Sequence, residues 1–263
     1  MLSSSFFIRS LVYGKKRIDF RSNTGKALAH RGGGHKRNYY IVDYKQSTWH
    51  IPALVLSLKY DPNRNARLAL VSYPNGLVSY IIAPLGICPG STLYSGFDSR
   101  LSIGSRFYLW QIPLGTRIFN VELTPGVGGL FARAAGTFSI ILRKTKTYVV
   151  VRLPSKELKM LPLTALATVG QVSNMSTQFT NLGKAGSSRW IGKRPVVRGV
   201  AKNPVDHPHG GGEGKTSGGR PSVTPWGIIT KGKPTRNKSK QSLKTVLRFR
   251  NGLTNLHSYI YKK

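Results

Sequence analysis

Short apolar runs separated by turn residues dominate the middle of the chain. A first group of four runs lies within residues 39–83, where Pro74-Asn75-Gly76 is typical of a hairpin turn. A second group of five lies within about 116–172, with turns at Thr124-Pro125-Gly126 and Pro154-Ser155. No helical period occurs between the runs, so each group predicts a small barrel. The predicted strands are 39–44, 53–60, 67–73 and 77–83, then 117–123, 137–142, 148–153, 157–163 and 168–172.

The pattern is interrupted between the groups and stops after them. Residues 106–115 are interpreted as a connection, with Pro113 and Gly115 as breaks. After Gly183 no hydrophobic period is sustained, so this part cannot bury enough apolar surface to offset its ordering entropy alone. We therefore predict an all-β protein with two tandem barrels and long, basic, irregular extensions. The expected division is an arm at 1–36, barrels at 37–110 and 111–182, and a glycine-rich extension at 183–263.

Charge indicates the class of partner. Lys and Arg number 41 against 8 Asp and Glu, which gives a net charge of +33 and a pI near 10.9. Self-repulsion of this size is tolerable when a polyanion neutralises it, so nucleic acid is the expected partner. A membrane partner is not expected, because the sequence contains no basic amphipathic helix and no apolar run near the roughly 20 residues that span a bilayer.

The N-terminus and the single cysteine add two expectations. Residues 1–12 are Ser-rich and free of acids, which is typical of an organellar targeting segment and equally of a basic arm that is retained. Cys88 alone excludes an intrachain disulfide and a cysteine-based zinc cluster. Because no basic residue is near it in the sequence, we interpret Cys88 as a small buried apolar side chain.

Two glycine-rich segments carry the candidate chemistry. Residues 203–214, Asn-Pro-Val-Asp-His-Pro-His-Gly-Gly-Gly-Glu-Gly, can form neither helix nor strand, and their glycines let a large partner approach the main chain. Residues 31–37, Arg-Gly-Gly-Gly-His-Lys-Arg, are either a flexible linker or a phosphate cradle. The cradle fits better, since Arg31, Lys36 and Arg37 would be counterions beside exposed backbone N–H groups.

His207 and His209 could be metal ligands, acid–base groups or RNA contacts. No further ligand at a rigid spacing and no orienting partner is visible, which favours stacking on a base or hydrogen bonding to phosphate or a 2′-hydroxyl. Trp190 and Trp226 lie among Lys and Arg, and each is either an anchor onto a barrel or a stacking platform for bases. We expect no metal and no cofactor.

These segments, taken in order, resemble the universal large-subunit ribosomal protein L-two family. The match covers roughly residues 25–240, and the 203–214 string is highly specific by itself. The other matching motifs are Arg31-Gly-Gly-Gly-His35-Lys36, Tyr60-Asp-Pro-Asn-Arg64, Leu123-Thr-Pro-Gly126 with Ala132-Arg133-Ala134-Ala135-Gly136, Leu182-Gly-Lys-Ala-Gly186 with Arg189-Trp190, Arg194-Pro195 with Arg198-Gly199, and Thr224-Pro-Trp-Gly227 with Thr230-Lys231-Gly232.

The resemblance implies an OB-like barrel, an SH3-like barrel and an extension buried in large-subunit rRNA. It implies a structural constituent of the large subunit that supports assembly, subunit association and the peptidyl-transferase region, beside neighbouring ribosomal proteins and facing the small subunit. His207 corresponds to the histidine proposed to matter for peptidyl transfer, and we interpret it as structural and RNA-positioning. The expected RNA-binding residues are Arg31, Gly32, Gly33, Gly34, His35, Lys36, Arg37, Arg64, Arg133, Lys184, Arg189, Trp190, Arg194, Arg198, Asn203, His207, His209, Gly210, Gly211, Gly212, Lys215, Trp226, Lys231 and Lys233.

Both ends depart from the family pattern. The N-terminal arm is short, and the last 20 or so residues are not family-like, which suggests an organellar member, mitochondrial rather than plastid. Two alternatives to a ribosomal protein stay open: a tRNA-acting enzyme that uses His207 and Asp206, and a free nucleic-acid chaperone.

Overall fold

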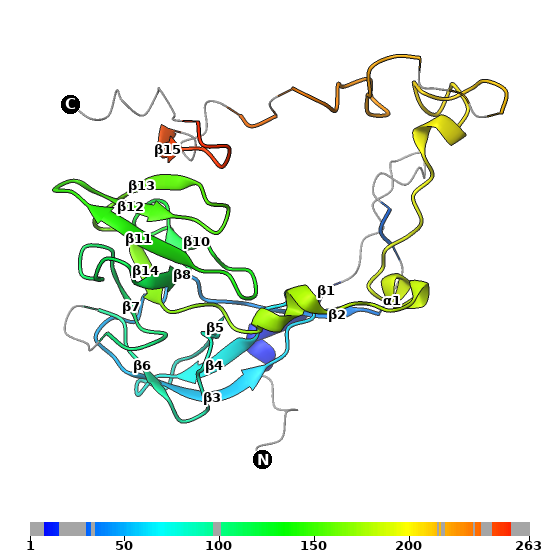
Figure 1. The fold of residues 1–263 in the computed structure, drawn as a ribbon. Helices are drawn as coiled ribbons and strands as arrows, with labels where there is room; N and C mark the ends of the chain where they lie inside the picture. Colours follow the sequence, from blue (N-terminus) through cyan, green and yellow to red (C-terminus); the bar gives the residue numbers. More distant parts are fainter. Residues whose placement is uncertain are drawn as a thin grey trace. The chain divides into compact units, whose positions relative to one another are not determined.

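The chain was analysed as a computed structural model, which describes residues 8–15, 30–32, 35–96, 101–214, 216, 219–233, 235–237 and 244–253. It forms two compact units. Unit 1 consists of residues 1–16, 36–181 and 239–263, and unit 2 of residues 17–35 and 182–238. Strands supply nearly all the regular structure of unit 1 (Figure 1), so the predicted all-β class is confirmed.

The first sheet of unit 1 has four antiparallel strands in the order β5-β4-β3-β6. Alternate side chains of these strands, including Val55, Val71 and Ile81, form one buried core. Tyr73 and Leu77 close the predicted hairpin, with Gly76 at φ 80°. A parallel bridge from Val42 to Tyr80 brings the segment after β2 beside this sheet. The strands are β3 (Ala53–Lys59), β4 (Leu68–Ser72), β5 (Val78–Ile82) and β6 (Thr92–Leu93), with the separate pair β1 (Val12–Lys15) and β2 (Arg37–Tyr40).

The second sheet of unit 1 has seven strands in the order β15-β13-β12-β11-β8-β14-β7. Its core is a second buried cluster that includes Ile118, Ile141, Val149 and Leu161. The strands are β7 (Arg106–Tyr108), β8 (Arg117–Phe119), β11 (Ser139–Lys144), β12 (Tyr148–Arg152), β13 (Leu158–Pro162), β14 (Leu166–Val169) and β15 (Val246–Arg248), beside the small pair β9 (Val121–Glu122) and β10 (Gly129–Phe131).

Most predicted strands are confirmed, but two assignments were wrong. β7 lies in the segment interpreted as a connection, and it pairs with β14 along three residues. β15 lies in the extension predicted to be irregular, yet it pairs with β13 and buries Val246 completely. Both strands have only three residues, and a charged residue occupies one end of each, so neither shows a readable period. The predicted strand 117–123 is interrupted at Asn120, where φ is 50°.

The interpretation of Cys88 as buried was also wrong, because its side chain is exposed. It lies in the turn between β5 and β6, where its backbone N–H donates to Ser91 Oγ at 3.4 Å. Ile87, the residue before it, fills the core position instead.

Unit 2 has little regular structure. It contains the short helix α1 (Ala185–Trp190), the 3-10 turn η3 (Gly199–Ala201) and a tight hairpin closed by a Val223–Ile229 bridge. Among its described residues only Gly32, Gly192, His207 and Val223 are buried. Apolar packing therefore contributes little to this unit. Unit 1 carries the remaining short 3-10 turns, η1 (Arg9–Leu11) and η2 (Met175–Phe179).

No helix in the described ranges is long and apolar enough to cross a membrane.

Candidate nucleic-acid interface

His207 and His209 form an internal brace of unit 2. Their rings stack with centroids 5.1 Å apart and planes at 25°. His207 Nδ1 accepts the backbone N–H of His209 at 3.0 Å, and His209 Nε2 accepts the backbone N–H of Val223 at 3.0 Å. Each accepting nitrogen must be unprotonated, so the arrangement requires both imidazoles to be neutral. The brace joins the 203–214 loop to the 222–230 hairpin.

The environment of His207 agrees with a neutral ring. Its side chain is buried, and the pKa of His207 lies below the ordinary value because burial disfavours imidazolium. The positive charge of nearby Lys202 lowers this pKa further, as would any proton on His209. The backbone N–H of His209 occupies the nitrogen that a general base would use, so catalysis would break the loop. The reading of His207 as a catalytic group is therefore not supported.

Glycine backbone surrounds this brace. A Cβ on Gly199 would meet the His207 ring at 2.5 Å, and a Cβ on Gly210 would overlap the backbone of Asn203. The N–H of Gly211 donates to Lys202 O at 3.0 Å, and Gly211 itself has φ 90°, a region that favours glycine. These glycines are thus needed for internal closure of the loop, a role that the sequence alone did not indicate.

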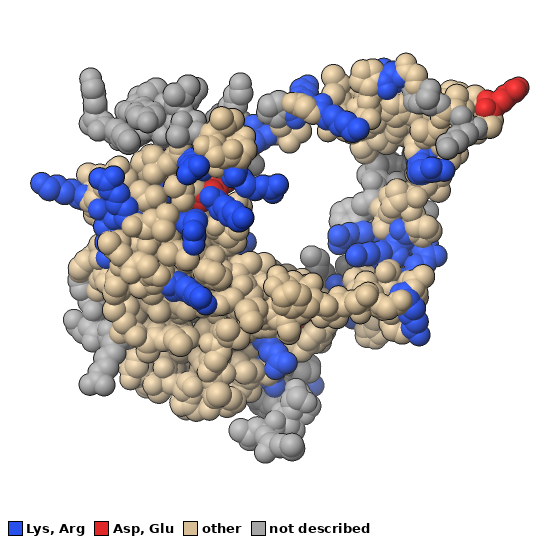
Figure 2. Space-filling model, viewed as in Figure 1, with Lys and Arg blue, Asp and Glu red and all other residues tan. Residues whose placement is uncertain are grey.

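The cationic and indole side chains of unit 2 lie on the outside of this closed backbone. Trp190 and Trp226 are each 68% exposed, and Lys184 Nζ lies 5.0 Å from the Trp190 ring centroid. Trp226 lies at the tip of the 222–230 hairpin, where Thr224 N–H donates to Ile228 O at 2.8 Å. Figure 2 shows Lys and Arg along this unit. The exposed candidates are Lys184, Arg189, Arg194, Arg198, Asn203, Gly212, Lys231 and Lys233.

Part of the 31–37 glycine-rich segment pairs with residues 192–194. Arg31 forms an antiparallel bridge with Lys193, and Gly32 N–H donates to Gly192 O at 3.1 Å. This pairing brings the 30–32 segment beside 192–194 within unit 2. His35 is exposed at the end of this stretch of unit 2. Lys36 and Arg37 belong to unit 1, where Lys36 is exposed and Arg37 donates to Pro62 O at 3.0 Å. Gly33, Gly34 and Lys215 lie outside the described residues.

In unit 1, Arg64 and Arg133 converge on one ring. The Arg133 guanidinium carbon lies 4.5 Å from the Tyr44 ring centroid and that of Arg64 lies 5.9 Å away. Arg64 also donates to the Tyr44 hydroxyl at 2.5 Å and pairs with buried Asp61 at 2.6 Å. The two arginines are far apart in sequence and half-buried. We call these three residues, Tyr44, Arg64 and Arg133, the Tyr44 cluster.

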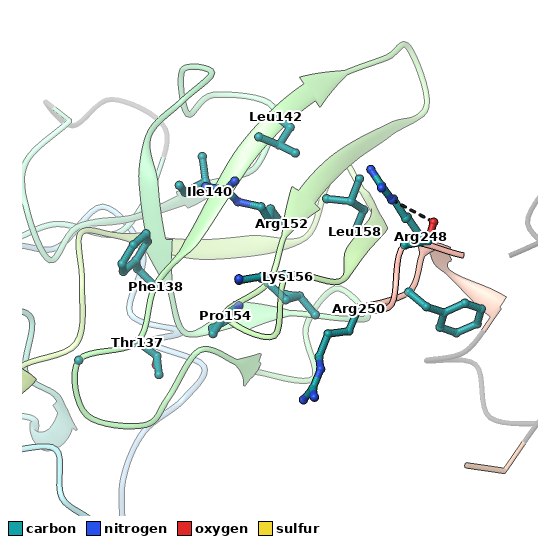
Figure 3. A pocket seen from close by; sticks show the side chains of 14 residues that line it. Thr137, Phe138, Ile140, Leu142, Arg152, Pro154, Lys156, Leu158, Arg248 and Arg250 are labelled. Carbon is teal, nitrogen blue, oxygen red and sulfur yellow. Dashed lines mark hydrogen bonds between the residues drawn. The ribbon is translucent and has the colours of Figure 1, made fainter. Parts of the chain in front are cut away.

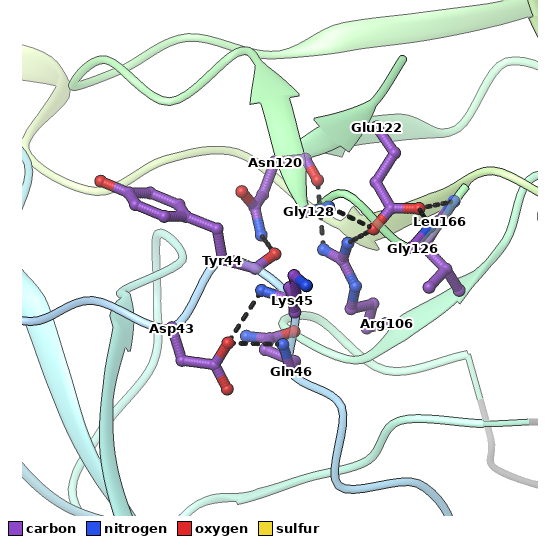
Figure 4. A network of polar contacts seen from close by, with 10 residues as sticks. All are labelled: Asp43, Tyr44, Lys45, Gln46, Arg106, Asn120, Glu122, Gly126, Gly128 and Leu166. Atoms are coloured by element: carbon purple, nitrogen blue, oxygen red, sulfur yellow. Dashed lines mark hydrogen bonds and ion pairs between the residues drawn. The ribbon is translucent and has the colours of Figure 1, made fainter. Parts of the chain in front are cut away.

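A buried ion pair between Arg106 and Glu122 lies near the backbone of Tyr44 (Figure 4). Arg106 Nη2 and Glu122 Oε1 are 2.9 Å apart, with both side chains 1% exposed. Glu122 also accepts the backbone N–H groups of Gly126, Gly128 and Leu166 at 3.1–3.2 Å. Burial lowers the pKa of Arg106, although Glu122 opposes this effect, and the guanidinium stays charged.

The loop that Glu122 organises then holds Tyr44. Gly129 N–H and Asn120 Nδ2 both donate to Tyr44 O, at 3.1 and 3.3 Å. Sequence reasoning missed Tyr44, Arg106 and Glu122. The available signal was Glu122 within an apolar run of a chain that has only 8 acidic residues, because a buried carboxylate requires a partner.

Metal chemistry finds no support in the described part of the chain, where no group of three His, Cys, Asp or Glu side chains could hold an ion. Exposed cations and indoles on the closed glycine backbone of unit 2, in a chain whose other unit is all-β, define a nucleic-acid-binding protein. Two family models match the chain: Ribosomal Proteins L2, RNA binding N-terminal domain, over residues 8–95, and Ribosomal Proteins L2, C-terminal domain, over residues 102–227.

Individual relatives agree with these matches. Large ribosomal subunit protein uL2 of Ehrlichia ruminantium is 54% identical over 221 residues, which cover 84% of this chain and 80% of the relative. Large ribosomal subunit protein uL2m of Reclinomonas americana is 48% identical over 243 residues, covering 92% and 88%. The uL2 protein of Sphingopyxis alaskensis is 48% identical over 245 residues, covering 92% and 87%.

The chain belongs to the ribosomal protein L2 family. It is a structural, rRNA-binding protein of the large ribosomal subunit and not an enzyme.

Proposed function

We propose that the chain holds large-subunit rRNA through two surfaces, the outside of unit 2 and the Tyr44 cluster of unit 1. One observation carries the proposal. Backbone N–H groups of unit 2 donate hydrogen bonds to carbonyl groups and imidazoles of the same unit. Its described Lys and Arg side chains are exposed, apart from the half-buried Lys202. A unit built this way has its positive charge available for phosphates, and neutralising that charge supplies the affinity.

The exposure of each side chain in unit 2 decides the role that we propose for it. Arg194 and Arg198 contact phosphates, because their side chains are exposed and arginine pairs with phosphate through two N–H groups. Trp190 and Trp226 stack on bases, which their 68% exposure favours over burial against protein. His207 and His209 act indirectly, by holding the loop that presents its neighbours.

By the same proposal the chain supports assembly of the large subunit, its association with the small subunit and the peptidyl-transferase region, beside other ribosomal proteins. The ribosome is proposed to be mitochondrial, with the plastid as the alternative. The support is the uL2m relative of Reclinomonas americana at 48% identity, although the bacterial relatives are as similar. Fractionation of cells that carry a tagged chain distinguishes the two organelles.

Salt dependence of rRNA binding tests the proposal. Each lost phosphate contact reduces the slope of log K against log salt by roughly 0.9 on duplex RNA, so Arg194→Gln with Arg198→Gln should reduce it by about 1.8. The matched pair Arg143→Gln with Lys146→Gln, exposed in the β11–β12 hairpin, removes the same charge and should leave the slope nearer the original. Equal slopes for both pairs would contradict a role for unit 2.

Sedimentation separates this function from that of a free chaperone. The tagged chain should sediment with the large subunit at moderate salt. Recovery in the light fractions would instead favour the chaperone.

A further inference from the structure

A groove of about 720 Å³ lies on the outer surface of the seven-stranded sheet (Figure 3). Its floor is apolar, formed by Phe138, Ile140, Leu142 and Leu158. Cations surround this floor: Arg152 from β12, Lys156 from the β12–β13 turn, and Arg248 and Arg250 from β15 and the turn that follows. The fourteen described residues that line the groove include no Asp or Glu.

The strand register explains how the cations alternate with the apolar floor. Ile140 on β11 pairs with Arg152 on β12, Arg152 with Leu158 on β13, and Leu158 with Arg248 on β15. Residues paired across strands point to the same face, and adjacent strands lie roughly 4.8 Å apart. The arginines are therefore about 10 Å apart, with an aliphatic residue between them. On the other side, Ile140 pairs with exposed Arg117 of β8, which lies 4.8 Å over the Phe138 ring.

β15 completes the groove. Arg248, Phe249, Arg250 and Gly252 all line it, and Arg248 Nε donates to Gly252 O at 3.2 Å. A hydrogen bond from β13 holds the residue before this strand, because Met160 N–H donates to Thr245 O at 2.8 Å. The match to the family model ends at residue 227, so this side of the groove lies beyond the matched domain.

The backbone at Lys156 supports a functional reading. Its φ is 68°, in the left-handed region that usually favours Gly, Asn or Asp. Strain of this kind persists where the surrounding structure fixes it, and it concentrates at functional sites. Here it places an exposed ammonium group beside Arg152 and Pro154 at the rim of the groove (Figure 3).

We propose that this groove binds a single-stranded segment of RNA, with phosphates on Arg152, Lys156, Arg248 and Arg250 and a base or ribose over the Phe138–Ile140–Leu142 floor. Charge complementarity selects the ligand, because a ring of cations without a carboxylate requires an anion. The alternation with apolar and aromatic side chains matches a strand that carries phosphates and flat bases together. The site rests on the proposed function and adds a contact that is separate from unit 2 and from the Tyr44 cluster.

An acidic peptide fits the groove less well. A peptide that binds by strand addition needs a free strand edge, and the edge of β13 is already paired with β15. The open surface here is a sheet face with side-chain cations, which offers no backbone ladder to a peptide.

A site-resolved cross-link tests the proposal in the full chain. Leu142→p-benzoylphenylalanine places a photoreactive group on the floor, at a position that is 42% exposed. Titration with a short oligouridine should give a saturable RNA cross-link. Adding Arg152→Gln with Arg248→Gln removes two phosphate contacts, so at about 0.1 M salt the apparent affinity at this site should fall roughly 25-fold.

The matched pair Arg143→Gln with Lys146→Gln should leave that cross-link unchanged, and thermal unfolding should show that every variant is folded. An unchanged cross-link in Arg152→Gln with Arg248→Gln, or an equal loss with the matched pair, overturns the proposal. In assembled large subunits the Leu142 probe should attach to RNA, and attachment to protein, or to nothing, overturns it as well. Failure of the whole chain to sediment with large subunits would refute the proposed function instead.

Discussion

Unit 1 and unit 2 are stabilised in different ways. Unit 1 has four apolar clusters, in which residues such as Val71 and Ile141 are fully buried. Unit 2 has one buried apolar side chain among its described residues, Val223, and depends on backbone hydrogen bonds, glycine contacts and the His207–His209 brace. Burial of apolar side chains stabilises unit 1 in water, whereas it contributes little to the stability of unit 2. The difference implies that damage to unit 1 should appear as lost stability, and damage to unit 2 as lost RNA binding.

The largest expected effect is in unit 1. Glu122→Gln leaves the buried Arg106 without its counter-charge, and breaking a buried pair in this way costs about 3–5 kcal/mol. Chemical denaturation of the full chain should show this loss. Glu213→Gln, the same change at an exposed residue of unit 2, should alter stability by less than about 0.5 kcal/mol. A loss below about 1 kcal/mol for Glu122→Gln would show that the network is not needed for the fold.

An added methyl group in unit 2 should weaken rRNA binding without destabilising unit 1. Gly199→Ala pushes a Cβ against the His207 ring, and overpacking typically costs about 1–3 kcal/mol, or roughly five- to 150-fold in rRNA affinity. The unfolding midpoint of unit 1 should stay the same. Gly186→Ala is the control, since nothing lies within 4 Å of its Cβ. Equal affinities for the two variants would argue against the brace.

The sequence predicts some strands of unit 1 and misses others. Strands β3, β4, β5 and β11–β13 follow from apolar runs of five to seven residues bounded by turns. β7 and β15 do not, because three residues cannot show a period and Arg106 is buried only by virtue of its distant partner Glu122. Long-range pairing, and not local pattern, determines such strands.

The sequence also predicts the candidate site only in part. Glycine-rich composition and charge indicated the loops at 31–37 and 203–214, but hydrogen bonds to His207 and His209 come from backbone groups that any sequence carries. Composition therefore identified which segments matter without distinguishing residues that brace the loop from residues that face outward. Tyr44 was missed because its two arginine partners come from other loops.

A smaller effect is expected from pH. The folded-state pKa of His207 lies below its ordinary value of 6.5, so the unfolded loop binds the proton more readily and the brace weakens as pH falls below that value. Hydrogen exchange of the His209 amide, corrected for its intrinsic rate, should accelerate in this range. The Thr230 amide, which donates to Ser222 O at 3.0 Å, should not. Parallel behaviour of both amides would indicate a change unrelated to the imidazoles.

The smallest effect is expected at Cys88. Its exposed thiol should react with a maleimide in the folded chain, and modification should leave rRNA affinity and the unfolding midpoint unchanged, since the core uses Ile87. Protection of the thiol until unfolding would show that the turn between β5 and β6 is packed differently.

The pairing of β15 with β13 has one further consequence. Because β14 and β15 belong to the same sheet, the unit 2 residues 182–238 between them are connected to unit 1 at both ends. The entropy of closing such a loop depends only logarithmically on its length, about 0.6 kcal/mol per doubling. Insertions or deletions within this loop should leave the sheet intact, so evolution can lengthen or shorten unit 2 without refolding unit 1.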